Sequence, residues 1–169
     1  MKTWHVAAIS ALVLMGLMSW PFVRAQLGYG VEIPANAPIG GDFELTRQDG
    51  RDMLLTELGA QGYWLSFMEP SCQDCPAELE RVHALGLDGQ LVVVSADPDL
   101  DPAVLGRWVN QYAPNAVSFG GDRAALARVI GRYRLPAVPG ESGLEYPIRW
   151  YQLDGSAALV ELHAAGFTR

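Results

Sequence analysis

The chain has 169 residues, of which half are hydrophobic, and a formal net charge of -7 at pH 7. This length fits one compact domain with an N-terminal extension and argues against a second full domain. After residue 25 the chain carries ten basic and nineteen acidic residues, and the basic ones are scattered arginines. We therefore expect no nucleic-acid partner.

An uncharged stretch over residues 6–23 lies between Lys2 and Arg24. Its length falls between that of a signal-peptide core and that of a membrane-spanning helix, so residues 1–25 are predicted to be either a cleaved signal peptide or a membrane anchor. Both alternatives place the remaining chain in the periplasm or another extracytoplasmic compartment, either free after cleavage or tethered to the inner membrane through residues 6–23.

Residues 26–41 are rich in glycine and proline and have no apolar period, so we expect an extended linker. The folded domain is expected over residues 42–169. Its hydrophobic pattern predicts, in chain order, a hairpin of strands 43–46 and 53–55, a buried strand 63–68, a helix 76–87, a buried strand 91–95, a helix 102–113, a short strand 116–119, a helix from 122 to about 133, and a closing hairpin of strands 148–153 and 158–163.

Local signals support the ends of several of these elements. Asp49-Gly50 is typical of a tight hairpin turn. Pro76 suits the first turn of a helix, where its missing N–H would have no partner, and Asp122 is a favourable N-cap residue. The order of elements predicts an α/β domain, with a mixed central sheet flanked by helices, that opens on a hairpin and follows a hydrophobic leader helix.

Cys72 and Cys75 form a C-x-x-C pair between a buried strand and the start of a helix, a pattern typical of a thioredoxin-like fold. The partial positive charge of a helix start favours the thiolate that disulfide exchange needs. A second thiol must lie close enough to resolve the mixed disulfide. We predict that Cys72 attacks from the exposed helix tip and that Cys75, further in, resolves. Glu69 and Asp74 oppose thiolate formation, so the attacking thiol should not be extremely acidic.

Three other roles for the cysteine pair are open. A structural disulfide that closes about four residues would stabilise the fold by only roughly 2 kcal/mol through loop entropy. A structural zinc site needs further ligands, but there is no third cysteine and His5, His83 and His163 are scattered. Two buried, inert thiols suit an exported protein poorly. We therefore favour a redox-active pair.

Several motifs follow one another in a characteristic order. GDFELT at 41–46 is followed by LSF at 65–67 ahead of the cysteines, by VVSADPD at 93–99, and by a closing hairpin around 153–155. This order resembles the Sco/SenC family, thioredoxin-fold proteins associated with maturing the copper site of cytochrome c oxidase. The resemblance covers about residues 41–163.

The candidate site departs from that family in two ways. Members normally have C-x-x-x-C and a copper-ligating histidine in a D-H-S segment, whereas this chain has C-x-x-C and reads LEYPI at 144–148. Pro147 instead resembles the cis-proline of thioredoxins, so Tyr146 and Pro147 are predicted to contact the substrate; a proline that simply starts a strand is the alternative. The family's C-terminal helix has no counterpart, so we expect one sheet face to be incompletely covered.

These features support three functional hypotheses. The first is an extracytoplasmic thiol-disulfide oxidoreductase that requires no cofactor and acts on a protein thiol or disulfide, for which the resemblance suggests a cuproprotein such as cytochrome c oxidase. The second is a chaperone that holds Cu(I) between Cys72 and Cys75, because soft thiolates suit Cu(I). The third is a membrane-tethered assembly factor without turnover.

Overall fold

The computed structural model describes residues 37–139 and 144–168. The predicted leader, residues 1–25, and most of the predicted linker lie outside this range. Within the range, no helix has both the length and the apolar character needed to cross a membrane. The chain joins the fold at Gly40, which forms a β-bridge with Ala158, and at Gly41, whose N–H donates to the Ala157 carbonyl.

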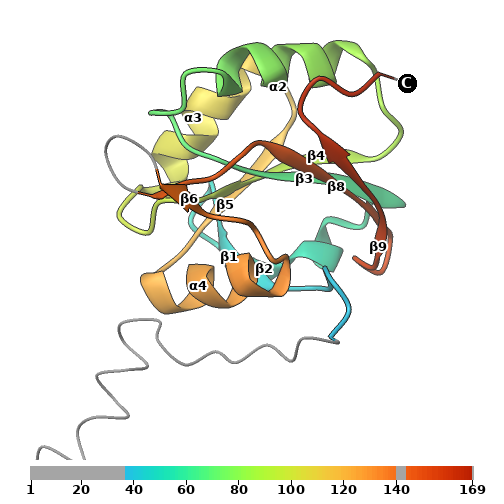
Figure 1. The fold of residues 1–169 in the computed structure, drawn as a ribbon. Coiled ribbons are helices and arrows are strands. Elements are labelled where there is room, and N and C mark those ends of the chain that lie inside the picture. Colours follow the sequence, from blue (N-terminus) through green and yellow to red (C-terminus); the bar gives the residue numbers. More distant parts are fainter. Residues whose placement is uncertain (1–36, 140–143, 169) are drawn as a thin grey trace, which may run out of the picture.

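The described residues form three layers, with a sheet between α2 and α3 on one face and α4 on the other (Figure 1). The helices are α2 (Cys75–Ala84), α3 (Pro102–Tyr112) and α4 (Arg123–Arg132), with a short 3-10 helix, η1, at Leu55–Leu58. The main strands are β1 (Glu44–Arg47), β2 (Asp52–Leu54), β3 (Gly62–Met68), β4 (Gln90–Ser95), β5 (Val117–Gly120), β8 (Arg149–Asp154) and β9 (Leu159–Ala164).

The sheet is mixed and has the strand order β2-β1-β5-β4-β3-β8-β9. The three central strands β5, β4 and β3 are parallel to one another, and the two terminal hairpins join them by antiparallel pairing. The predicted α/β architecture with its opening hairpin is confirmed. A separate pair of short strands, β6 (Val138–Pro139) and β7 (Leu144–Glu145), lies between the predicted helix that ends near residue 133 and the predicted strand 148–153, where no strand was predicted.

Strand β3 supplies side chains to both sides of the sheet. Tyr63, Leu65 and Phe67 pack with residues of α4, whereas Trp64 and Met68 pack with residues of α2 and α3. This division follows from the period of two in a strand, which points successive side chains to opposite faces. Because both faces are covered, all of these side chains are buried. Strand β3 therefore leads from the middle of the core directly into the cysteine loop.

The last strand, β9, forms an edge of the sheet and carries two exposed apolar side chains. On β9, Val160 is 60% exposed and Leu162 is 38% exposed. Beyond β9 the chain turns back so that the C-terminal segment lies beside α2 (Figure 1). There Phe167 packs against the apolar cluster shared by α2 and α3. The C-terminal segment thus covers part of the α2 side without forming a helix.

Candidate functional site: a disulfide at the start of α2

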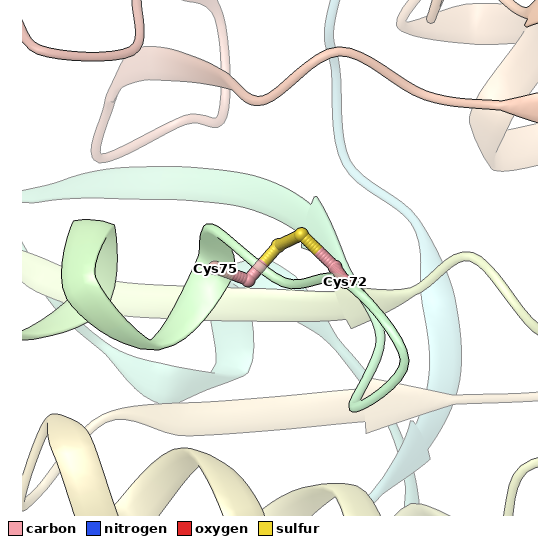
Figure 2. Close-up of a disulfide and its surroundings, with 2 residues drawn as sticks. All are labelled: Cys72 and Cys75. Atoms are coloured by element: carbon pink, nitrogen blue, oxygen red, sulfur yellow. A yellow bond between two sulfur atoms is a disulfide. The ribbon is translucent and has the colours of Figure 1, made fainter.

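Cys72 and Cys75 are joined by a disulfide, and their Cα atoms lie 5.5 Å apart. The bond connects the loop after β3 to the first turn of α2 (Figure 2). Cys75 is 1% exposed, whereas Cys72 is partly exposed. The predicted difference in depth between the two sulfur-bearing residues is therefore present. The helix begins at Cys75, however, so Cys72 lies in the preceding loop and not on the helix tip.

The cysteine loop is shaped by its own backbone. The Cys72 N–H donates to the Glu69 carbonyl over 3.1 Å, which closes a turn directly after β3. Asp74 is the N-cap residue of α2, but its side chain makes no capping hydrogen bond, and Pro76 occupies the first turn. The partial positive charge of the helix start is therefore not offset by a side-chain cap at the position of the disulfide.

Glu78 is a buried carboxylate one helical turn after Cys75, on the buried face of α2. The indole Nε1 of Trp150 donates to its Oε1 over 3.0 Å. Arg81 donates through Nε over 2.9 Å and through Nη2 over 2.6 Å. The Gly166 N–H lies 3.2 and 3.3 Å from the two carboxylate oxygens. Glu78 therefore connects α2 to β8 and to the C-terminal segment.

The pKa of Glu78 reflects two opposed effects. Burial raises the pKa of its carboxyl group, but the hydrogen bonds from Arg81, the Gly166 backbone and Trp150, together with the charge of Arg81, lower the pKa below its ordinary value. The carboxylate is therefore ionised at neutral pH, and its negative charge is balanced within the fold by Arg81.

The C-terminal segment is held by a group of ring contacts. The Phe167 ring stacks on the Trp64 indole, with centroids 5.5 Å apart and planes 5° apart. The Arg81 guanidinium lies 5.0 Å from the Phe167 ring centroid, and the His163 ring lies 4.6 Å from it. The His163 ring also contacts Trp64, with centroids 5.2 Å apart. His163 is thus part of this packing.

The family model of SCO1/SenC matches residues 31–160 of the chain. The chain belongs to the SCO1/SenC family. Protein SCO2 homolog, mitochondrial, of Bos taurus is 30% identical over 145 residues, which are 75% of this chain and 54% of that protein. Protein SCO1 homolog 1, mitochondrial, of Arabidopsis thaliana is 32% identical over 111 residues, which are 59% of this chain and 33% of that protein.

The SCO1/SenC chain thus spans about a third to about a half of the length of these curated relatives. Its structure is similar to the crystal structure of Arabidopsis thaliana ScoI with copper bound, with a TM-score of 0.67 and 26% identity over 76% of this chain and 89% of that one. The fold is therefore thioredoxin-like, as the cysteine spacing predicted.

Two thiolates are the soft ligands that this SCO1/SenC chain offers to copper at the site. Across residues 37–139 and 144–168, no group of three or more His, Cys, Asp or Glu side chains is arranged to hold a metal ion. The histidines of this range, exposed His83 on α2 and packed His163 on β9, therefore do not complete a ligand set with the cysteines. After reduction, the two thiolates would fit two-coordinate Cu(I).

The predicted substrate residues Tyr146 and Pro147 lie just before β8. No peptide bond among the described residues is cis, so the Tyr146–Pro147 bond is trans and the proposed likeness to the thioredoxin cis-proline is wrong. Pro147 is exposed and starts the approach to a strand, which is the alternative weighed above. Tyr146 packs against the core cluster on the α4 side of the sheet. Ile148, two residues later, packs against the cluster on the side of α2 and α3, as Cys72 does.

The buried polar residues nearest to the cysteines along the chain, Ser66 and Glu78, were not predicted as part of the site. Glu78 falls at the helical spacing of Cys75, Leu79 and Val82, so its place on the apolar face of α2 was the available signal. Ser66 falls on the buried strand β3, where a hydroxyl among apolar residues was the signal.

Proposed function

We propose that this SCO1/SenC protein is a thiol-disulfide oxidoreductase in which Cys72 is the residue attacked by, or attacking, the substrate and Cys75 is the resolving residue. One observation carries the proposal: the two cysteines are bonded to each other, and they differ in exposure. A purely structural bridge between residues this close along the chain contributes roughly 2 kcal/mol through loop entropy. The partly exposed Cys72 gives an exchange partner a sulfur atom to reach.

The reaction balances between two dithiols. A substrate thiolate attacks Cys72 Sγ, which forms a mixed disulfide, breaks the Cys72–Cys75 bond and releases Cys75 as a thiolate. The second substrate thiolate then attacks the first substrate sulfur, which is bonded to Cys72 in the mixed disulfide. This step forms the substrate disulfide and releases Cys72 as a thiolate. The substrate is oxidised by two electrons and the protein is reduced by two electrons. The reverse sequence reduces a substrate disulfide, with Cys72 attacking first and Cys75 resolving.

We further propose that the substrate is a pair of cysteines in a cuproprotein. The family and the copper-bound relative support this class of partner. Tyr146 and Pro147, which are joined by a trans peptide bond, are proposed to contact the substrate chain. The N-terminal division into leader 1–25 and linker 26–41 supports placing the domain outside the cytoplasm, where such disulfides persist.

A second candidate function is that of a Cu(I) carrier. The crystal structure of the Arabidopsis relative with copper bound favours it, and two thiolates are chemically suited to Cu(I). Copper would be the cargo of this reaction, held only while both cysteines are reduced. The absence of a third ligand among the described residues ranks this candidate second.

A parallel measurement on residues 26–169 separates the two candidates. The reduced protein is titrated with Cu(I) against a Cu(I) chelator, and the cysteine couple is equilibrated with glutathione buffers. Exchange with a reduced two-cysteine peptide is timed, with the Cys72→Ser variant as the control. The proposal predicts rapid exchange that Cys72→Ser abolishes. Tight stoichiometric copper together with a sluggish, very negative couple would replace it with the carrier function.

A further inference from the structure

Ser66 is a buried hydroxyl without a hydrogen-bond partner. Four polar or charged residues of the described chain are buried, and the side chains of three of them have hydrogen-bond partners. The other side-chain atom in the same unpartnered state, Tyr63 Oη, belongs to the opposite face of the sheet. A buried polar atom without a partner is costly, and a redox or catalytic role is one explanation for its retention. The satisfied residues are Glu78, held by Arg81 and Trp150; Ser95, bonded to Asp97; and Ser118, bonded to Gln48.

The topology places Ser66 on the cysteine side of the sheet. It lies on β3 between Trp64 and Met68, and the period of two in a strand gives all three the same face. Trp64 and Met68 pack in the cluster that contains Cys75. Helix α2 follows β3 through the cysteine loop and covers this face, with Cys75 directed inward at its first turn. Ser66 and Cys75 therefore share the buried layer between the sheet and α2.

The charge and hydrogen-bonding state of Cys75 in this layer differ between the disulfide and the reduced pair. As a disulfide, Cys75 carries neither a charge nor a donor, and no hydrogen bond joins it to Ser66. When the bond to Cys72 breaks, Cys75 becomes a thiolate in apolar surroundings, which favour the neutral thiol and oppose its release. A hydroxyl donor in the same layer would lower the cost of that charge.

We propose that the Ser66 hydroxyl is the hydrogen-bond partner of Cys75 in the reduced protein, where it donates to the Cys75 sulfur and holds it in position for resolution. The inference rests on the proposed function, because the reduced pair is one of the two states of that redox cycle. In this role Ser66 stabilises the dithiol relative to the disulfide. It makes the couple more oxidising than an apolar residue at the same place would.

The test compares Ser66→Ala with Ser118→Ala in the full chain. Ser118 is equally buried, but its hydroxyl already bonds to Gln48, so its removal should affect both redox forms alike. Each protein is equilibrated with glutathione and its disulfide, and the oxidised fraction is measured by thiol labelling. Ser66→Ala should favour the disulfide about threefold to tenfold more than the parent does, which is roughly 14 to 30 mV toward more negative potential. Ser118→Ala should leave the equilibrium within twofold.

Unfolding in urea supplies the second readout. Ser66→Ala should leave the oxidised form as stable as the parent or more stable, because it removes an unpaired hydroxyl, and should destabilise the reduced form. Equal glutathione equilibria for parent and Ser66→Ala, or an equal shift in Ser118→Ala, would overturn the inference. The equilibrium with glutathione is measured without a protein substrate. Failure of exchange with a two-cysteine peptide would therefore count against the proposed function and not against the role of Ser66.

Discussion

Replacing Glu78 by alanine should weaken the attachment of α2 to the sheet. The substitution removes the acceptor of the Trp150 indole N–H, and Trp150 is fully buried, so no water replaces it. An unpaired buried donor costs about 1–3 kcal/mol. The Arg81 side chain is 30% exposed and can turn to solvent, which adds less than about 1 kcal/mol. The expected loss in unfolding free energy is therefore about 1–4 kcal/mol.

Urea unfolding of the oxidised protein at pH 7 measures this loss. Glu80→Ala is the matched control, because Glu80 lies on the same helix and is exposed, so its replacement should change the unfolding free energy by less than about 0.5 kcal/mol. Glu78→Gln retains an acceptor for Trp150 and should lose less than Glu78→Ala. If Glu78→Ala and Glu80→Ala were equally stable, the carboxylate would not hold α2.

The pH dependence supplies an independent check on Glu78. Its folded-state pKa lies below the ordinary 4.5, so the carboxylate contributes stability that is fully present above the unfolded-state pKa and is lost as the pH falls through the folded-state pKa. The difference in unfolding free energy between the parent and Glu78→Gln should therefore be constant near neutral pH and should narrow below about pH 4.5. A difference that widens toward acid would contradict the assigned direction of the shift.

Other substitutions test the roles of the two cysteines, the stacking of Phe167 and the N-cap of α4. Cys72→Ser should abolish exchange and Cys75→Ser should accumulate mixed disulfides on gels without reductant; equal trapping by both variants would refute the assigned roles. Phe167→Ala should lower the unfolding free energy by about 1–2 kcal/mol through loss of its stacking on Trp64, and an unchanged urea midpoint would show that this contact contributes nothing. Asp122→Ala should cost about 1 kcal/mol in thermal or urea unfolding, because its carboxylate caps α4, and no loss would contradict that cap.

The sequence predicted the elements whose signals are local. Strand β3 was marked by a continuous apolar run, and it extends only one residue further than expected. The cap of α4 was predicted from a single aspartate and is present: Asp122 accepts from the Ala125 N–H over 2.7 Å. Such signals act within a few residues, so the neighbouring sequence is enough to recognise them.

The hydrogen bonds that hold α2 beside the site could not be predicted, because they join residues that are distant along the chain. Glu78 bonds to Trp150 and Gly166, which are 72 and 88 residues away. Likewise, η1 depends on Asp42, which accepts from the Thr56 N–H across 14 residues. The sequence located the cysteine pair and ordered its members by depth. It gave no means to tell that the backbone before β8 would be trans at Pro147.

The disulfide and the Glu78 contacts act on different parts of α2, and this separation matters for a redox cycle. The disulfide ties only the first turn to the cysteine loop, across a sequence separation of 3. Glu78 and Arg81 tie the following turn to β8 and to the C-terminal segment through contacts that contain no sulfur. We therefore expect that breaking the Cys72–Cys75 bond releases the loop while the helix stays anchored. On the proposed function, Cys75 then stays buried beside the same neighbours in both redox states, and the partly exposed Cys72 carries the substrate.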